Sequence, residues 1–484
     1  MAGGKQAVWA PRGASGLSGA SCVVAGAGRS GRAAAALLQM AGASVVVSDS
    51  SRSPGVREAA DALTRAGVAV ELGAHKAATF RSADLVVISP GVPSDAPFLR
   101  DARSRGVPII AEVELGSWFI PGKLIAVTGT NGKSTVVTLT GRMLNQSGVP
   151  AVVAGNIGTP LCEVVGKLHE TDVVVAEISS FQLETVETFH ADVSVLLNVE
   201  ADHIDRHGSF DAYLAAKSRL LALQREDDVA VLSADRPEVW ALAPGCRAQV
   251  VGASRARRVT PGAFVSSDRV VVCWGGVERD VCGVDEVRLA GSHNLENVLA
   301  SVAACAPLVG DWMGATDALR DFAGLPHRLQ PVGRAGGVRF IDDSKATNPA
   351  AVVRALESVE PPVVLIAGGR AKGADFTPLG SAVSGVVSAA VLIGEAADEV
   401  GDAVAGATVV RRADSMDEAV DIAYGLADGA GTVLLSPACA SFDMFGGYAE
   451  RGAAFAEAAA RICSSAAGPP APPAKSKRAA GATA

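Results

Sequence analysis

Short apolar runs alternate along the chain with longer segments that are rich in alanine. From Ser21 onward, each run of valine, isoleucine or leucine has the length of a strand and ends in glycine, serine, aspartate or proline. The segments between the runs have the length of helices, so the alternation predicts βαβ units and parallel sheets. The clearest predicted strands are residues 21–26, 44–48, 84–89, 124–128, 172–178, 193–199, 338–341, 363–367 and 432–436.

Most residues that could carry chemistry lie just after one of these strands. Ligands of open α/β sheets bind outside the carboxyl ends of the strands, so this placement predicts active-site loops. One predicted helix, residues 209–223, breaks the usual pattern because Lys217 falls within its apolar stripe. A lysine at such a position is expected either to extend its ammonium group to solvent or to have a special role.

The chain has 484 residues, which exceeds one ordinary hydrophobic core and predicts two to three domains. The expected fold class is α/β with three domains: an N-terminal Rossmann-like domain, a central P-loop-type ATPase with a mainly parallel sheet, and a C-terminal Rossmann-like domain. The predicted boundaries are a flexible N-terminus at 1–20, domains at 21–120, 121–325 and 326–463, and a tail at 464–484. The tail is rich in alanine, proline and lysine, so it is predicted to be disordered.

Charge and cysteine content narrow the possible functions. The formal net charge of −8 argues against a general affinity for nucleic acid or anionic membranes, although small anionic substrates remain possible. The eight cysteines are scattered without a CxxC pair, so they are expected to be reduced and mostly buried. Residues 1–20 lack the apolar core of a signal peptide, and Pro378 interrupts the uncharged stretch 376–393. We therefore expect a cytoplasmic protein without membrane insertion, and a helix followed by a strand at 376–393.

A candidate phosphate loop, Thr-Gly-Thr-Asn-Gly-Lys-Ser-Thr, occupies residues 128–135 between a predicted strand and a predicted helix at 136–147. Its glycines let backbone N–H groups turn toward phosphate oxygens, Lys133 supplies a positive charge, and the Ser134 hydroxyl can reach Mg²⁺. Val127 stands where the strict P-loop pattern has its first glycine. An ordinary strand–turn–helix corner is the alternative, but the flanking elements favour ATP binding.

Two strand ends in the middle of the chain carry acidic residues and histidines. Glu177 ends an apolar run, where a carboxylate near a phosphate loop is placed to hold Mg²⁺. Residues 200–207 then contain three acidic residues and two histidines. A lone histidine is more often a packed core residue, but this concentration after a strand favours a functional site.

A first glycine loop, Gly26-Ala-Gly28-Arg-Ser-Gly31, follows a predicted strand and opens a helix, and Asp49 ends the next strand. This pattern fits a dinucleotide fingerprint. A UDP-sugar carries the same pyrophosphate group, which the loop and the helix N-terminus would bind equally well. The pattern therefore leaves both ligands open.

Two late strand ends carry further motifs. In residues 342–349, Asn348-Pro349 is explained as the start of a helix, but the charged residues before it are not. In residues 436–445, Cys439 could act as a nucleophile. Its apolar setting, with no histidine after His327, favours a packed thiol instead.

Taken in order, these motifs resemble those of the Mur ligase family. Residues 128–135 are similar to the variant phosphate loop of these ligases and of folylpolyglutamate synthetases, and the segments 213–217, 291–297, 324–328, 343–348, 368–376 and 436–441 resemble later family motifs. The resemblance runs from about Ser21 to Arg461. It implies an ATP-dependent ligase that forms an amide bond through an acyl phosphate. Within the family, the sequence is most similar to the branch that adds D-glutamate to UDP-N-acetylmuramoyl-L-alanine in cytoplasmic peptidoglycan precursor synthesis.

The resemblance also implies ATP and Mg²⁺ as cofactors, a monomer, no nucleic-acid partner, and a role for each matching residue. The implied ATP contacts are Gly129, Thr130, Asn131, Gly132, Lys133, Ser134, Thr135, Asn294, Asn297, Arg328, Asp343 and Lys345. The implied UDP-substrate contacts are Ser30, Asp49, Ser50, Arg52, Gly91, Asn156 and His203. The implied D-glutamate contacts are Thr347, Lys372, Ser441 and Tyr448. The implied catalytic residues are Lys133, Glu177, His203 and a carbamylated Lys217, of which the last three, with Ser134, would also hold metal.

Three rival functions remain open. A ligase of the same family with another amino acid or a folate substrate would share the mechanism, although the D-N-P-R type motif of the diaminopimelate- and lysine-adding enzyme does not occur here. An NAD-binding oxidoreductase would explain the first glycine loop but leaves residues 128–135 without a role. A catalytically silent nucleotide-binding subunit would bind ATP without substrate-dependent phosphate release.

Overall fold

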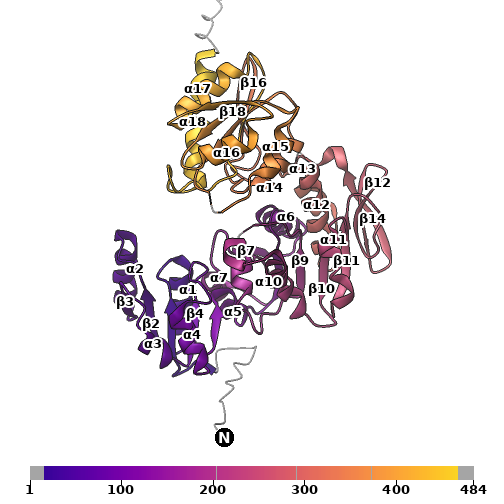
Figure 1. Ribbon diagram of the computed structural model, residues 1–484. Helices are drawn as coiled ribbons and strands as arrows, with labels where there is room; N and C mark the ends of the chain where they lie inside the picture. The colour runs from indigo at the N-terminus through magenta and orange to yellow at the C-terminus, as the bar shows by residue number, and fades with distance from the viewer. Residues whose placement is uncertain (1–15, 203, 290, 372, 467–484) are drawn as a thin grey trace, which may run out of the picture. The chain divides into compact units, whose positions relative to one another are not determined.

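The computed structural model describes residues 16–202, 204–289, 291–371 and 373–466 (Figure 1). The chain divides into two compact units, Met1–Ala323 and Gly324–Ala484. The first unit contains two sheets and the second contains one, and parallel pairs of strands predominate in all three. The predicted α/β class is therefore confirmed, while the domain boundaries stay predictions. His203 and Lys372, two of the predicted site residues, lie outside the described residues.

The first sheet has five parallel strands in the order β3-β2-β1-β4-β5. The chain moves outward from β1 in one direction and then crosses to β4 on its other side, which creates a switch point where ligands of such sheets bind. The first glycine loop follows β1 at this point. The elements are β1 Ser21–Ala25, α1 Arg29–Met40, β2 Ser44–Asp49, α2 Pro54–Arg65, β3 Ala69–Leu72, α3 Ala77–Arg81, β4 Leu85–Ile88, α4 Pro97–Ser104, β5 Ile109–Ala111 and α5 Glu112–Ser117.

The second sheet has nine strands in the order β14-β13-β12-β11-β10-β9-β6-β8-β7. The strands from β7 to β12 are parallel, whereas β13 and β14 are antiparallel at one edge. Its elements are β6 Lys123–Thr128, α6 Lys133–Gln146, β7 Ala151–Gly155, α7 Leu161–Val164, β8 Val173–Glu177, α8 Ser180–Leu183, β9 Val193–Leu196, α9 Ile204–His207, α10 Phe210–Ala222, β10 Val229–Ser233, α11 Pro237–Trp240, β11 Gln249–Ser254, β12 Gly262–Ser266, β13 Arg269–Trp274, β14 Val277–Gly283, α12 Ser292–Cys305 and α13 Met313–Asp321.

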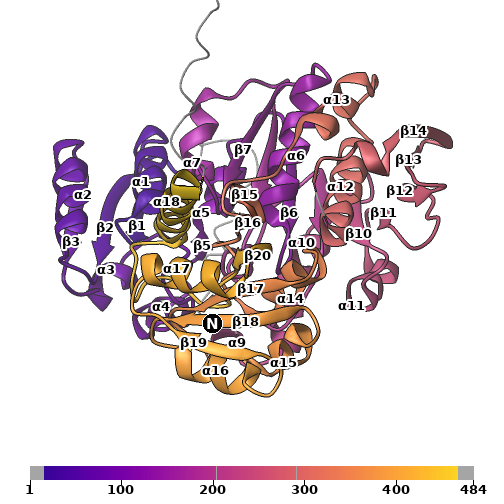
Figure 2. The same cartoon turned by 90° about the horizontal axis from the view of Figure 1, so that it is seen from above.

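The sheet of the second unit has the order β15-β16-β20-β17-β18-β19, with β15 antiparallel to its neighbour (Figure 2). Helices α14, α15 and α16 cover one face, and α17 and α18 cover the other. The elements are β15 Gln330–Ala335, β16 Gly337–Asp342, α14 Pro349–Glu357, β17 Val363–Gly368, α15 Thr377–Val383, β18 Val387–Ile393, α16 Ala397–Val404, β19 Val409–Arg412, α17 Met416–Leu426, β20 Ala430–Leu435 and α18 Tyr448–Ala466.

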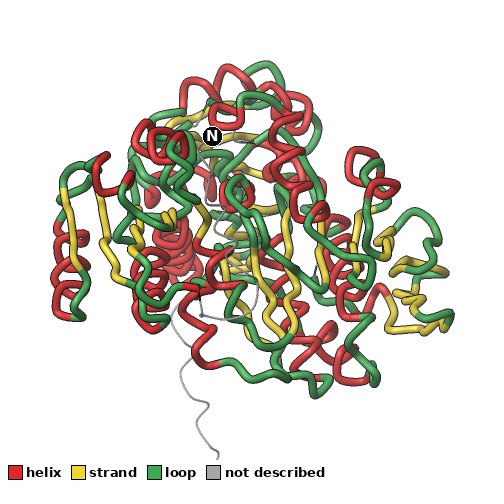
Figure 3. Tube along the Cα trace, turned by 90° about the horizontal axis from the view of Figure 1, so that it is seen from below, coloured by secondary structure: helices red, strands yellow, loops and turns green. Residues whose placement is uncertain are grey.

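All nine predicted strands form, each within about three residues of its predicted ends (Figure 3). The uncharged stretch 376–393 is α15 followed by β18, as expected. Leu17, which lies in the predicted N-terminal segment 1–20, is buried in the core of the first sheet. Helix α18 runs to Ala466, three residues beyond the predicted boundary at residue 463. None of the described helices is long and apolar enough to cross a membrane.

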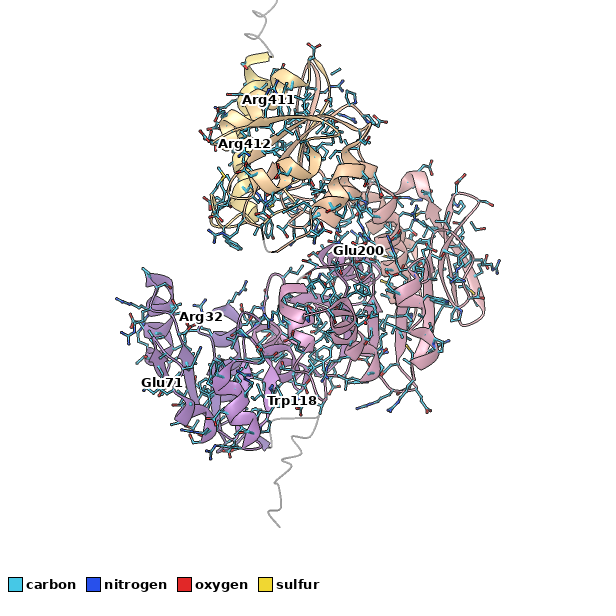
Figure 4. All side chains as sticks on the ribbon, viewed as in Figure 1. Arg32, Glu71, Trp118, Glu200, Arg411 and Arg412 are labelled. Carbon is cyan, nitrogen blue, oxygen red and sulfur yellow. The ribbon has the colours of Figure 1, made fainter. Side chains whose placement is uncertain are left out.

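Two buried carboxylates on α5 connect the first sheet to the second within the first unit. Glu112 Oε1 accepts a hydrogen bond from the backbone N–H of Cys162 at 2.7 Å. Glu114 accepts bonds from the backbone N–H groups of Thr188 at 2.8 Å and Glu187 at 3.1 Å, and from the indole of Trp118 at 3.2 Å, which Figure 4 labels. Both carboxylates are at most 1% exposed, so their bonds to main-chain amides replace the water that each has lost.

The Glu112 carboxyl should make stability depend on pH. Burial raises its pKa to about 7, against a usual value of 4.5, and its Oε2 has no hydrogen-bond partner among the described residues. Between these two values the folded state retains a proton that the unfolded chain has released. Glu112 therefore lowers the free energy of unfolding as pH rises through this window, by on the order of 1–3 kcal/mol.

Glu112→Gln keeps the acceptor oxygen for Cys162 and removes the ionisation. We expect the variant to unfold at a higher temperature than the wild type at pH 8, and at the same temperature below pH 4.5. Melting curves across this range test the prediction, with Glu71→Gln on β3 as a control for removal of a carboxylate. Equal melting temperatures at pH 8 would contradict it.

Candidate active site

The phosphate loop joins the carboxyl end of β6 to the start of α6. Gly129 and Gly132 both have positive φ angles, +155° and +87°, which favour glycine. A Cβ atom on Gly132 would also collide with the side-chain oxygen of Asn297 from α12. Thr135, two residues into α6, is buried beneath the loop. The loop is thus shaped by its glycines, with its backbone N–H groups at the N-terminus of a 14-residue helix.

Two lysine side chains converge on one carbonyl group of this loop. Lys133 Nζ donates to Gly129 O at 2.8 Å and to Thr130 O at 2.9 Å, and Lys217 Nζ donates to Gly129 O at 2.9 Å. Lys217 is 1% exposed, so its ammonium group does not extend to solvent. Of the two expectations for a lysine in an apolar stripe, a special role therefore remains. Burial and the charge of Lys133 hold the pKa of Lys217 well below its usual range. Its amine is therefore far more readily neutral than that of an ordinary lysine.

Glu177, at the carboxyl end of β8, faces the same loop and is 2% exposed. Its Oε2 accepts from Ser134 Oγ at 2.7 Å, and its Oε1 accepts from Asn156 Nδ2 at 2.9 Å. The predicted site residues Glu177, Ser134 and Lys217 thus surround the phosphate loop. Asn156, assigned to the UDP-substrate by resemblance, orients Glu177 instead of lining the cavity beside the first glycine loop.

The other loop residues are tied to the segment after β9. Thr130 Oγ1 accepts from the backbone N–H of Glu200 at 2.9 Å, and Asn131 Nδ2 donates to Glu200 Oε2 at 3.1 Å. Asn198, which the sequence did not single out, accepts from the backbone N–H of Asn131 at 2.9 Å. Figure 4 labels Glu200 in this region. The segment after β9 is therefore fixed to the phosphate loop through Asn198 and Glu200.

The residues around Glu177 fit the way in which proteins usually hold Mg²⁺. No group of three His, Cys, Asp or Glu side chains close enough to hold a metal is found among the described residues. Mg²⁺ usually binds to one or two carboxylates together with substrate phosphates, and keeps several waters. One oriented carboxylate and a serine hydroxyl beside a phosphate loop fit that description.

The predicted adenine contacts lie on α12, which packs against α6. Asn297 Nδ2 donates to Asn294 Oδ1 at 3.2 Å, so the two asparagines form one polar edge beside Gly132. Glu296 between them accepts from Arg236 at 2.9 Å and from Arg255 at 3.2 Å. This ion network is not predictable from the sequence, because its three members come from distant segments.

A cavity of about 420 Å³ lies beside the first glycine loop. Four predicted UDP-substrate residues line it, namely Ser30, Asp49, Ser50 and Gly91. Ser89 Oγ, also in its lining, is buried without a hydrogen-bond partner among the described residues, so it is available to a ligand. Arg52 does not line the cavity, because its guanidinium donates to Leu72 O at 3.3 Å.

His75 also lines this cavity and was missed by the sequence analysis. Its Nδ1 lies 2.9 Å from Ser48 Oγ, and its ring stacks on Phe98 with centroids 4.2 Å apart. Burial lowers the pKa of His75, and the charge of Asp49 opposes that shift. Its position shortly after β3 could have indicated a place in this cavity, because the end of β3 lies at the same sheet edge as the glycine loop.

In the second unit, the predicted motif 342–349 forms a loop after β16. Asp343 is buried, where its Oδ2 accepts from Ser436 Oγ at 2.8 Å, and burial raises its pKa to about 7. Lys345 Nζ donates to Tyr448 OH at 3.2 Å, so these two predicted residues lie together. Asn348 caps α14 by accepting from Ala351 N at 2.8 Å, as expected.

The remaining predicted residues of the second unit are spread over neighbouring loops. Thr347 is partly exposed, and its N–H donates to Lys345 O at 2.9 Å. Ser441 is 3% exposed, in the loop after β20. Arg328 lies before β15, and its backbone N–H donates to Leu325 O at 3.3 Å. Cys439 is 1% exposed and burial raises its pKa to about 12, which confirms a packed thiol.

A buried arginine that the sequence analysis missed joins the two main loops of the second unit. Arg451 on α18 is 1% exposed and donates to Ser344 Oγ at 3.0 Å, Ser344 O at 2.8 Å and Cys439 O at 3.1 Å. Burial lowers its pKa to about 10. No sequence signal marks a lone arginine on a C-terminal helix, yet this guanidinium fixes loop 342–349 against loop 436–445.

Comparisons with known protein families identify three matching domains along the chain. Residues 20–111 match the Mur ligase MurD-like N-terminal domain, residues 127–305 the Mur ligase middle domain, and residues 327–439 the glutamate ligase domain of Mur ligases. The chain belongs to the Mur ligase family.

Individual relatives show which enzymes of this family the chain is similar to. The chain is 43% identical to a UDP-N-acetylmuramoylalanine--D-glutamate ligase of Pelotomaculum thermopropionicum, over 90% of this chain and 96% of that protein. It is 42% identical to the enzyme of the same name from Acidobacterium capsulatum, over 91% and 96%. Among solved structures, UDP-N-acetylmuramate-alanine ligase from Thermotoga maritima shares the fold, with a TM-score of 0.56 and 19% identity over 92% of this chain and all of that one.

Removal of the Arg451 guanidinium should loosen the second unit. Arg451→Met keeps much of the side-chain volume but leaves the carbonyls of Ser344 and Cys439 without their donor, at a cost of about 3 kcal/mol in the free energy of unfolding. Arg461→Met on the same helix removes only an exposed ion pair with Asp417, which contributes about 0–1 kcal/mol. Urea unfolding of both variants tests the difference, and equal midpoints would contradict it.

Proposed function

We propose that this protein joins D-glutamate to the L-alanine carboxylate of UDP-N-acetylmuramoyl-L-alanine at the expense of ATP. The observation that carries the proposal is the convergence of Lys133 and Lys217 on Gly129 O beside Glu177. This arrangement supports phosphoryl transfer. The choice of substrates is supported by relatives named for this reaction that are similar over 90% or more of the chain.

The first step transfers the γ-phosphoryl group of ATP to the alanine carboxylate, which gives an acyl phosphate and ADP. The backbone N–H groups of residues 129–135 and Lys133 hold the phosphates, and Asn294 and Asn297 contact the adenine. Glu177, Ser134 and His203 would hold Mg²⁺, which would neutralise part of the phosphate charge. Such fixed positive charge supplies most of the catalysis in phosphoryl transfer.

Lys217 contributes to this step as a carbamate. Its neutral amine attacks CO₂, a new N–C bond forms, and one proton is released to solvent, so an ammonium group is exchanged for a carboxylate. The depressed pKa of Lys217 favours this reaction because only the neutral amine is nucleophilic. The carbamate then carries a negative charge beside Lys133, where an ammonium group would be repelled, and can serve as a further metal ligand.

In the second step the amine of D-glutamate attacks the acyl phosphate, and inorganic phosphate leaves to give the amide. Thr347, Ser441, Tyr448 and Lys372 hold the amino acid, while Arg328, Asp343 and Lys345 complete the ATP site. Water would hydrolyse the acyl phosphate, so the reaction requires a closed site.

The UDP-sugar occupies the cavity beside the first glycine loop, with its diphosphate at the N-terminus of α1. Ser30, Asp49, Ser50 and Gly91 line that cavity. The family resemblance alone adds His203 to the substrate contacts of this proposal. A cytoplasmic location, a monomeric state and peptidoglycan precursor synthesis as the pathway belong to the same proposal.

The first experiment measures phosphate release from ATP with UDP-N-acetylmuramoyl-L-alanine and a panel of amino acids. Release that requires D-glutamate is expected, with L-glutamate, L-lysine and diaminopimelate at background. Release with another amino acid would retain the ligase chemistry and overturn the assignment of Ser441 and Tyr448. No release with any amino acid would indicate a silent nucleotide-binding subunit.

Loss of the Lys217 carbamate should abolish activity in a way that an added carboxylate reverses. Lys217→Ala is expected to reduce kcat at least 100-fold, about 3 kcal/mol of transition-state stabilisation. Acetate or propionate should restore part of it by occupying the vacated space. Lys167→Ala, which removes a lysine outside the site, serves as the control under the same acids. Full activity of Lys217→Ala without added acid would exclude the carbamate.

A further inference from the structure

Arg29 lines the cavity beside the first glycine loop, yet its guanidinium is bound to the segment before and within α7. It donates to Gly158 O at 2.6 Å, to Thr159 Oγ1 at 3.4 Å, and to both carboxylate oxygens of Glu163 at 3.1 and 3.2 Å. These bonds join the first residue of α1 to residues 158–163, which follow β7 of the second sheet. The arginine side chain is 53% exposed, so a ligand in the cavity can reach it.

The segment that Arg29 binds also orients the catalytic carboxylate. Asn156 lies two residues before Gly158; its backbone N–H donates to Glu177 O at 2.8 Å and its side chain donates to Glu177 Oε1 at 2.9 Å. Gly155 has a φ of +105°, and a Cβ there would collide with the main chain of Glu177. Gly155 N also donates to Thr159 O at 2.9 Å, which closes the turn. A shift at residues 158–159 is therefore transmitted to Asn156 and Glu177.

The charges of Arg29 and Glu163 indicate how a bound diphosphate would affect residues 158–163. Hydrogen bonding to Arg29 holds the pKa of Glu163 below its usual range, so Glu163 is ionised and paired with the guanidinium. A nucleotide diphosphate at the N-terminus of α1 brings further negative charge beside Arg29. A planar guanidinium can bind a carboxylate on one edge and still offer N–H groups to a phosphate.

We propose that Arg29 is a positioning residue that couples the binding of a nucleotide diphosphate sugar in the first cavity to the placement of Asn156 and Glu177 at the phosphate loop. The proposal rests on the function proposed above. It adds a reason why phosphoryl transfer occurs only after the sugar nucleotide has bound. An exposed ion pair adds little to stability. The effect of Arg29 is therefore expected in kcat and in the ordering of residues 155–164.

The kinetic test compares Arg29→Ala, Glu163→Ala and the double variant with the wild type. We expect Arg29→Ala to lower kcat roughly tenfold, with the melting temperature unchanged within error. The double variant should be no slower than Arg29→Ala, because both changes remove the same interaction. Arg32→Ala, an exposed arginine on the same helix that Figure 4 labels, should retain wild-type kcat. An increase in KM for the sugar nucleotide with unchanged kcat would overturn the coupling and leave Arg29 as a binding residue only.

Hydrogen–deuterium exchange gives a second measurement that does not require turnover. Adding UDP-N-acetylmuramoyl-L-alanine to the full-length wild type should slow exchange in residues 155–164, and Arg29→Ala should lose this protection while exchange near Ser30 and Gly91 is still slowed. Equal protection in both proteins would overturn the proposal. If the wild type shows protection but no D-glutamate-dependent phosphate release, the proposed function fails while the coupling survives.

Discussion

The Gly129 carbonyl is the point on which the central site depends, because it accepts hydrogen bonds from the Nζ atoms of two lysines at 2.8 and 2.9 Å. Two like charges within a buried site repel each other, and burial also disfavours each charged form. The loop can keep both lysines only if one becomes neutral, is converted to an anion, or shares a bound anion with the other. Each of these outcomes is useful to an enzyme that binds the phosphates of ATP.

Sheet topology brings the partners of this loop together. Strands β6, β8 and β9 are parallel neighbours, so their carboxyl ends lie at one edge of the sheet and deliver the phosphate loop, Glu177 and the segment around Glu200 to the same place. The glycines then allow neighbouring groups to come closer than a Cβ atom would permit. Gly132 lies close to Asn297 in this way, and Gly155 lies close to Glu177. Local chain geometry and strand order thus act together, since neither alone would place a carboxylate beside Ser134.

The sequence predicts features that depend on local pattern and misses those that depend on tertiary contact. The strands, the phosphate loop and the cap at Asn348 were predictable because alternation, glycine spacing and capping are local properties. Glu112 and Arg451 were not, since each is defined by main-chain groups of distant segments. The structure also adds side-chain contacts that resemblance does not supply: Arg52 donates to Leu72 O, and Asn156 donates to Glu177. The antiparallel edge β12 to β14 was likewise absent from the predicted strands.

Asp49 shows why the first glycine loop could not identify its ligand. In a dinucleotide site an acidic residue at this position binds the ribose hydroxyls. Here Asp49 Oδ2 accepts from Ala27 N and Oδ1 accepts from Ser51 N, both at 2.8 Å, so the carboxylate holds the glycine loop and the turn after β2 in shape. The loop requires that acid whichever diphosphate it binds, and the spacing that resembles a dinucleotide fingerprint follows from this structural need. Discrimination must therefore come from the residues that complete the cavity, among which His75, held by Ser48 and stacked on Phe98, has no counterpart in the fingerprint.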